Sequence, residues 1–191
     1  AIARVLESPL VPSAVELLNE TAAQEVARSS DAIAGLRGAV LALAIASMPD
    51  AVSAQVHSAQ EMVGGASGNL VLEGQAQDAF WAAVRDFGVD DGSALIMKAG
   101  VPLGNVAEAM DRAEQLAAQY GLGIAIVSEA GTGVLLFYCR AVHGEAEASR
   151  LAGMVESLRD CMLRARGSRV VLRAPVEVKS LVDVWGPPGS G

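Results

Sequence analysis

The second half of the chain alternates short apolar runs with longer amphipathic stretches, in an order that few folds accommodate. Strands are expected at residues 94–99, 122–128, 133–140 and 168–173, and helices at residues 104–120 and 144–165. This β-α-β-β-α-β order is that of the ferredoxin-like fold, in which an antiparallel sheet carries its helices mainly on one face. We therefore expect an α+β chain whose second sheet face is free to cover something.

The first ninety residues predict an additional α-β-α-β-α segment. Ser13 and Glu16 have the spacing of a capping box, which favours a helix from there to about Arg28. The other expected elements are a strand at 39–47, a helix from Pro49 to 63, a short strand at 69–73 and a helix at 75–87. The chain divides most naturally into subdomains 1–90 and 91–175, with residues 176–191 starting a segment that returns to another domain.

Composition and charge exclude several classes of protein. Hydrophobic residues make up 52% of the chain and aromatic residues 4%, which is typical of an aliphatic core. The net charge of −8 is spread along the chain without a basic run, so nucleic acid is not an expected partner. Cys139 and Cys161 are too few for a disulfide framework and lack the neighbours of a zinc site, which favours a reduced, cytoplasmic setting. The longest apolar run, 39–48, is too short for direct membrane insertion.

Three stretches, in the same order along the chain, resemble one known family. They are residues 8–18, residues 121–127 and residues 173–186, which run from Arg173-Ala-Pro to Trp185-Gly. Together they are similar to the C-terminal domain of FAD-linked oxidases, most nearly that of the FAD-binding E subunit of bacterial glycolate oxidase. Both ends of the chain read as cuts through a longer protein.

The resemblance implies a cap domain on the substrate side of a flavin-dependent oxidoreductase that acts on glycolate or a similar small 2-hydroxy acid. FAD would be held by an N-terminal FAD-binding domain of the same polypeptide, so none is expected in this fragment. The implied partners are other glycolate oxidase-like subunits, flavin-containing and iron–sulfur. The whole would be cytoplasmic or peripheral at the inner membrane through those partners.

One departure from the catalytic relatives bears on the chemistry. Those relatives carry a His-x-Gly-Asp-Gly-Asn-Leu-His loop whose two histidines ligate a divalent metal, and a later Gly-Glu-His-Gly that supplies a catalytic histidine. The matching residues 129–136 place Glu129 and Leu136 at the histidine positions, and residues 173–178 contain no histidine. No metal is therefore expected, and no catalytic residue can be assigned. An alternative function is a non-catalytic assembly or electron-relay subunit that has lost these histidines.

Four side chains are candidates for binding the substrate. Strand alternation places Tyr138 and Arg140 on one face, and Arg169 and Arg173 on one face of the last strand. Arg173 and Arg140 suit a bidentate grip on a carboxylate, although either could instead cover the sheet as a surface arginine. Glu129, beside a glycine turn, is the fourth candidate.

Other residues have plainer interpretations. Trp185, in an exit segment rich in Gly and Pro, is a candidate contact with the flavin-binding domain. Lys98 near a strand end, His57 within a helix and His143 at a helix start are expected to be solvated or structural. A third class of function, a free-standing ferredoxin-like module that senses a metabolite, is allowed by the fold alone.

Overall fold

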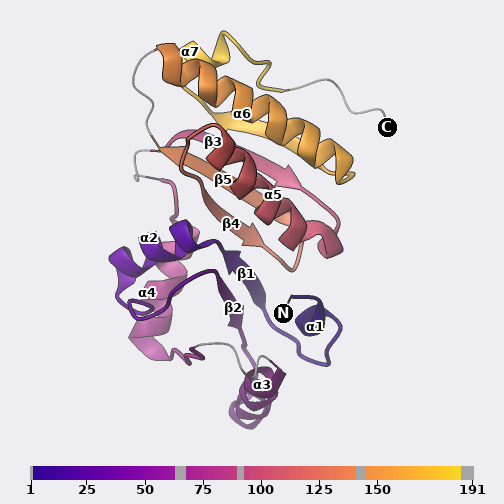
Figure 1. Ribbon diagram of the computed structural model, residues 1–191. Helices are drawn as coiled ribbons and strands as arrows, with labels where there is room; N and C mark the ends of the chain where they lie inside the picture. The colour runs from indigo at the N-terminus through magenta and orange to yellow at the C-terminus, as the bar shows by residue number, and fades with distance from the viewer. Residues whose placement is uncertain (1, 63–67, 90–92, 141–144, 186–191) are drawn as a thin grey trace.

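Six strands form a single antiparallel sheet in the computed structural model, which describes residues 2–62, 68–89, 93–140 and 145–185 (Figure 1). The strand order is β2-β1-β4-β5-β3-β6. The strands are β1 (Ala14–Leu18), β2 (Val40–Ala44), β3 (Ser93–Gly100), β4 (Ala125–Glu129), β5 (Val134–Arg140) and β6 (Ser168–Arg173). The helices are α1 (Ile2–Leu6), α2 (Glu20–Ser30), α3 (Pro49–Met62), α4 (Gly74–Arg85), α5 (Val106–Gln119), α6 (Glu145–Arg164) and α7 (Val176–Lys179), with a 3-10 turn at Leu103–Asn105.

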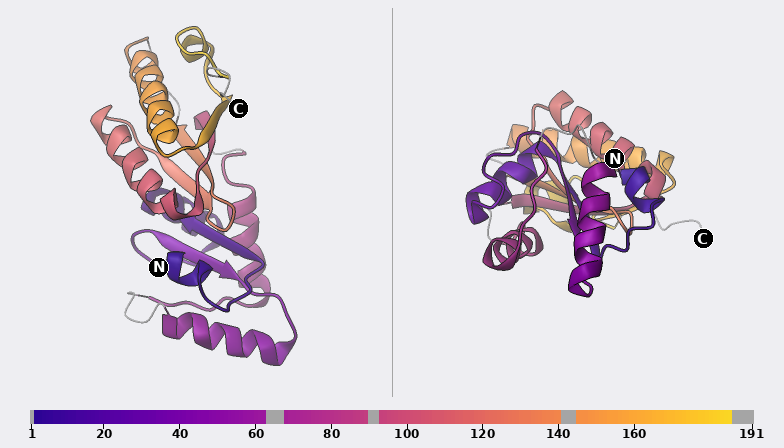
Figure 2. Two further views of the ribbon diagram at one scale, coloured as in Figure 1. Left: turned by 90° about the vertical axis from the view of Figure 1, so that its right-hand side faces the viewer. Right: turned by 90° about the horizontal axis from the view of Figure 1, so that it is seen from below.

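The second half of the chain confirms the predicted α+β class and the β-α-β-β-α-β order. Helices α5 and α6 lie side by side on one face of the sheet, and Figure 2 shows them on the side opposite to α4. Their apolar stripes, with Leu151 and Leu158 fully buried, pack against Met97, Leu135 and Phe137 of the inner strands. We call this covered side the first face.

The opposite, second face is covered over only part of its area. Helices α2 and α4 bring Val26, Phe80 and Val84 against Ile96 and Tyr138, at the end of the sheet where β3 begins and β5 ends. The expected free face is therefore restricted to the other end, near the turn between β4 and β5. This uncovered end positions the candidate site described below.

The predicted helix over residues 13–28 is wrong in its first turns, because residues 14–18 form β1. This strand pairs with β2 on one side and with β4 on the other. The helix begins only after Asn19, whose side-chain oxygen accepts from the Ala22 N–H at 3.0 Å as an N-cap. The capping-box spacing of Ser13 and Glu16 was coincidental, since pairing on both sides stabilises a strand there.

Asn19 also fastens the N-terminal segment to the ferredoxin-like half. Its buried amide donates to the Ile124 carbonyl at 3.0 Å and to Glu114 at 2.9 Å, while its oxygen accepts from the Ile126 N–H at 2.9 Å. One side chain thus satisfies groups on α2, α5 and the beginning of β4, and the two halves share a continuous sheet.

The expected strand at residues 69–73 is not formed, and this stretch is irregular. The expected helices at 49–63 and 75–87 correspond to α3 and α4, while α1 had no counterpart among the predictions. Helix α3 buries none of its residues, and α1 is the element that it contacts most. The N-terminal segment thus has the order α-β-α-β-α-α.

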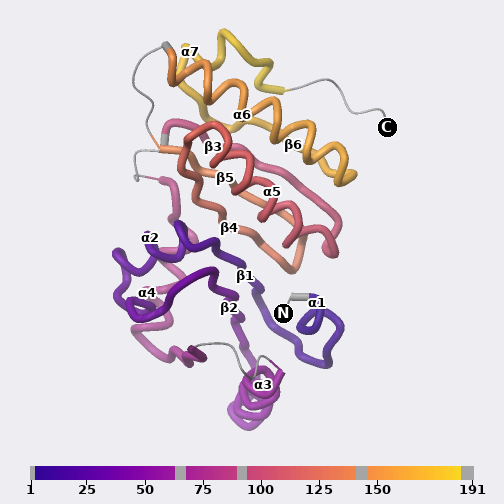
Figure 3. The backbone as a smooth tube through the Cα atoms, in the orientation of Figure 1, coloured from indigo at the N-terminus to yellow at the C-terminus, as the bar shows by residue number. Residues whose placement is uncertain are grey.

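The C-terminal segment lies along the outer edge of β6 and beside α6, as Figure 3 shows. The Val171 N–H of β6 donates to the Val184 carbonyl at 3.1 Å. Arg159, buried in α6, donates to the Asp183 carbonyl and to Glu156 at 2.7 Å. These contacts hold the segment as far as Trp185, while the remaining residues 186–191 of the predicted return segment lie outside the described part.

Candidate functional site

Tyr138 lies at the covered end of the second face and packs as a core residue. Its ring meets Phe87 edge-on, with ring centroids 4.9 Å apart. Gly88 has a φ of +80°, and a Cβ there would come within 2.1 Å of the Tyr138 ring, so only glycine fits. Arg173 approaches the same turn, since its Nη1 lies 3.5 Å from the Gly88 carbonyl oxygen. The structure therefore brings Tyr138 and Arg173 together.

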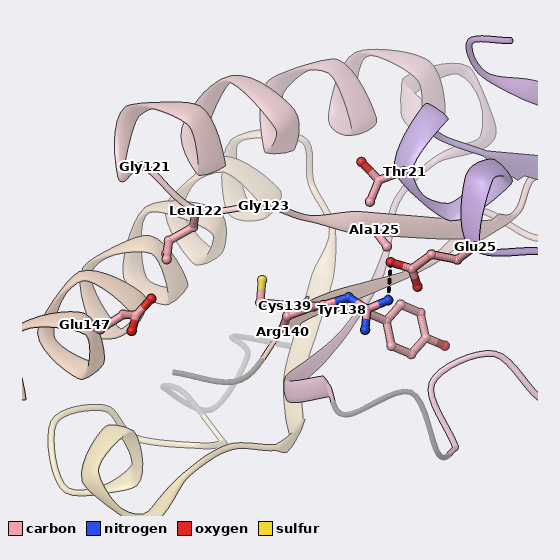
Figure 4. Close-up of a pocket in the computed structure, with 10 residues that line it drawn as sticks. All are labelled: Thr21, Glu25, Gly121, Leu122, Gly123, Ala125, Tyr138, Cys139, Arg140 and Glu147. Carbon is pink, nitrogen blue, oxygen red and sulfur yellow. Dashed lines mark ion pairs between the residues drawn. The ribbon is translucent and has the colours of Figure 1, made fainter. Parts of the chain in front are cut away.

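Arg140 ends β5 beside a cavity of about 270 Å³, shown in Figure 4. Its guanidinium forms an ion pair with Glu25 of α2 at 2.6 Å, so an acidic partner from this chain already balances its charge. Cys139 also lines the cavity, and burial raises the pKa of its thiol to about 12. A thiol with so high a pKa is not a nucleophile at neutral pH.

The predicted common face of Arg169 and Arg173 is wrong. The register between β3 and β6 shifts at Ile96 and Met97, so Arg173 lies opposite Ile96 while Arg169 lies opposite Ala99. Ile96 belongs to the core of the second face and Ala99 to that of the first. The irregularity therefore sends the two guanidinium groups to opposite faces, which strict alternation could not predict.

Glu129 lies at the uncovered end of the second face, where it is opposite Glu16 of β1 and Val134 of β5. Its Oε2 accepts from the Thr132 hydroxyl at 3.1 Å. The Oε2 atom of Glu16 is buried and has no hydrogen-bond partner among the described residues. Burial, and next the charge of Glu129, raise the pKa of Glu16 to about 7.

Lys98 is exposed near the same end and makes no ion pair with any residue that the structure describes. It sits inside the sheet, paired with Leu136 of β5 and Val170 of β6, and not at a strand end as the sequence indicated. We call the second-face surface formed by Lys98, Val134, Leu136, Glu129 and Glu16 the open face. It combines a half-buried apolar centre with one cation on one side and two carboxyl groups on the other.

The sequence-predicted site residues thus separate into two groups. Arg173, Tyr138 and Arg140 gather at the covered end, whereas Glu129 lies at the open end. Glu16 was not among the predicted site residues, because the sequence predicted a helix there. A charged residue within a short apolar run was nevertheless a signal that could have identified it. Trp185 is 77% exposed and lies apart on the C-terminal segment.

The remaining titratable candidates do not form a metal centre or a disulfide. His57 is exposed on α3 beside Glu61, as expected, and His143 lies outside the described residues. No group of three or more His, Cys, Asp or Glu in the described ranges is arranged to hold a metal ion. Both cysteines are free. Within the same ranges, none of the helices has the length and apolar character needed to span a bilayer.

The chain matches a known protein family. The family model described as "FAD linked oxidases, C-terminal domain" matches residues 1–169, which include all of the open face and end at the second residue of β6. No curated protein matches the chain.

Proposed function

Because the chain belongs to the family of FAD-linked oxidase C-terminal domains, we propose that its open face covers the flavin on the substrate side of a flavin-dependent oxidoreductase. Such a domain pairs with an N-terminal FAD-binding domain. The reaction we propose is the oxidation of glycolate or a similar small 2-hydroxy acid. The flavin supplies the hydride acceptor, and this chain supplies shape, charge and exclusion of water.

The observation that carries this proposal is the half-buried apolar centre of the open face. Val134 and Leu136 are half-buried on the second face, where Leu136 lies opposite Val127 at the margin of the cluster that α2 and α4 cover. A planar ring system fits against such a surface, because apolar side chains of neighbouring strands form a nearly flat layer. The cavity beside Arg140 and a second one between α5 and α6 measure about 270 Å³ each, below the roughly 300–1,000 Å³ of cofactor-sized sites. We therefore propose that the flavin is bound by the partner domain and only covered by this chain.

Cationic side chains on the second face support a carboxylic acid as substrate. Among the sequence-predicted residues, Arg173 is the candidate cation for its carboxylate, and Lys98 is the cation that the structure adds. Trp185 is proposed as a contact with the FAD-binding domain, because an exposed tryptophan on a tightly held segment is a suitable docking group. We place the complex in the cytoplasm or at the inner membrane surface through partner subunits.

A charge placed in the apolar centre tests the proposal. In the full-length protein with its FAD-binding domain, Leu136→Glu should slow anaerobic reduction of the flavin by glycolate more than tenfold, because a carboxylate facing the ring must be desolvated. The matched control is Leu163→Glu on α6, where an exposed leucine faces away from the sheet. Retained flavin absorbance shows that both variants still bind FAD. Equal reduction rates in the two variants would contradict the placement of the flavin.

The alternative is a non-catalytic subunit that assembles with, or relays electrons to, a catalytic sister. It is supported by Glu129 and Leu136 standing where a metal-binding relative would have histidines. The same reduction assay separates the two functions, since a relay subunit would be reduced by glycolate only after the sister subunit is added.

A further inference from the structure

Lys98 occupies an unusual position for a charged residue. Strand β3 lies inside the sheet between β5 and β6, and positions of this kind ordinarily hold β-branched or aromatic residues. The two residues opposite Lys98, Leu136 and Val170, are apolar and half-buried. No described carboxylate neutralises it, in contrast to Arg140 with Glu25. The ammonium group therefore lies above an apolar surface with its charge available to a ligand.

The two carboxyl groups face this cation across the apolar centre. Lys98 is on β3, Leu136 on the neighbouring β5, and Glu129 one strand further on β4, two positions along. From the usual spacing of strands and residues, the Cα atoms of Lys98 and Glu129 are about 12 Å apart. Once both side chains extend, the space between the ammonium and the carboxylate admits a molecule of a few heavy atoms.

We infer that the open face selects small 2-hydroxy monocarboxylic acids, with Lys98 binding the carboxylate and the Glu16–Glu129 pair disfavouring a second one. This inference rests on the proposed function and names the substrate class of the same site. A monocarboxylate places its one charge on Lys98 and turns its neutral hydroxyl end towards Glu129, which accepts a hydrogen bond from it. A dicarboxylic 2-hydroxy acid would bring its second charge against Glu129, which like-charge repulsion opposes.

Arg173 is a weaker candidate for the same carboxylate. It lies opposite Ile96, at the end of the second face that Phe80 and Val84 of α4 cover, and its guanidinium already approaches the Gly88 carbonyl. A carboxylate bound there would be displaced from the apolar centre towards the covered end. Lys98 lies two positions along β3 from Ile96, away from that end, and is paired directly with Leu136.

The chain offers a matched control, because Lys179 is its only other lysine and is exposed on α7, outside the open face. The experiment uses the full-length protein with bound FAD and takes pyruvate as the probe, since the 2-carbon of this 2-oxo acid carries no hydrogen that could be transferred to the flavin. Binding is measured by isothermal titration calorimetry, and circular dichroism confirms that each variant is folded.

Lys98→Met should weaken pyruvate binding at least tenfold, whereas Lys98→Arg should stay within about threefold and Lys179→Met should be unchanged. In turnover with glycolate, the same loss should appear in KM with little change in kcat, because the carboxylate is bound equally in the ground and transition states. Glu129→Gln should raise kcat/KM for malate relative to glycolate by about tenfold.

The outcomes separate the inference from the proposed function. If the parent protein binds pyruvate and oxidises glycolate but Lys98→Met matches it in both assays, the inference is overturned and the proposed function stands. If Glu129→Gln leaves the ratio of kcat/KM for malate to kcat/KM for glycolate unchanged, the role of the carboxyl pair is overturned. If the parent protein neither binds pyruvate nor is reduced by any 2-hydroxy acid, the proposed function fails, and the inference fails with it.

Discussion

Replacement of Glu16 by glutamine should remove the loss of folding stability that this side chain causes as pH rises. The pKa of Glu16 is raised from 4.5 to about 7, first by burial and then by the charge of Glu129. The folded chain therefore holds the proton more tightly than the unfolded chain. Between these two pKa values the unfolded state is ionised while the folded state keeps its proton, so stability falls as pH rises from about 4.5 to 7 and is level above.

The magnitude follows from the same shift. A difference of this size between folded and unfolded pKa corresponds to about 3.4 kcal/mol at most, because one pKa unit equals about 1.4 kcal/mol. Glu16 is only half-buried, and screening by water reduces the effect to roughly 1–2 kcal/mol. Glu16→Gln should therefore stabilise the chain by about 1–2 kcal/mol near pH 8 and by almost nothing near pH 4, where the carboxyl is protonated in both states.

Urea unfolding followed by far-UV circular dichroism, repeated between pH 4 and pH 8, measures this difference. The matched control is Glu177→Gln, which replaces an exposed glutamate on α7. A second variant, Glu129→Gln, removes the charge that contributes to the shift and should flatten the pH dependence in part. The reasoning is refuted if the free energy of unfolding of Glu16→Gln changes with pH as steeply as that of the parent chain.

Three further outcomes are expected. Asn19→Ala should lower the free energy of unfolding by about 2–4 kcal/mol, because it removes the N-cap of α2 and leaves buried groups of β4 without a hydrogen-bond partner. Urea titration measures this difference, and an effect below about 1 kcal/mol would contradict the prediction. In Cys161→Ser, the remaining thiol of Cys139 should react with a disulfide reagent at pH 8 only on unfolding, since burial raises its pKa to about 12; rapid labelling of the folded protein would disagree. Arg173→Ala should change the calorimetric affinity of the FAD-loaded protein for pyruvate less than threefold, and a tenfold loss would assign the carboxylate to Arg173.

The ferredoxin-like half could be predicted from the sequence because its periodicities are local. Leu151, Val155 and Leu158 recur at helical spacing within α6, and all three are fully buried. Gly121 directly follows the helix predicted at residues 104–120, and it adopts a φ of +65° just after the end of α5. Each of these signals lies within one turn of the element that it specifies, so no knowledge of distant contacts was needed.

The N-terminal part was less predictable because distant partners decide its conformation. Residues 14–18 satisfy a helical capping pattern, yet they form a strand because β2 and β4 are both available to pair with them. Their stability therefore depends on residues 125–129, which lie far along the chain. The position of Arg173 had a related cause, since a register shift against β3 is a property of the pair of strands and leaves no mark on β6 alone.

The open face escaped prediction because no local motif contains it. Lys98, Glu129 and Glu16 come from three strands that are far apart in sequence and become neighbours only through the order β1-β4-β5-β3. Each nevertheless interrupts or ends an apolar strand, and a charge inside a sheet is costly unless that face meets water or a ligand of opposite charge. The aliphatic residues around them raise that cost, so the charges mark the part of the sheet that the described helices leave exposed. It follows that the charged positions of central strands, more than the glycine turn beside Glu129, were the residues from which this surface could have been found.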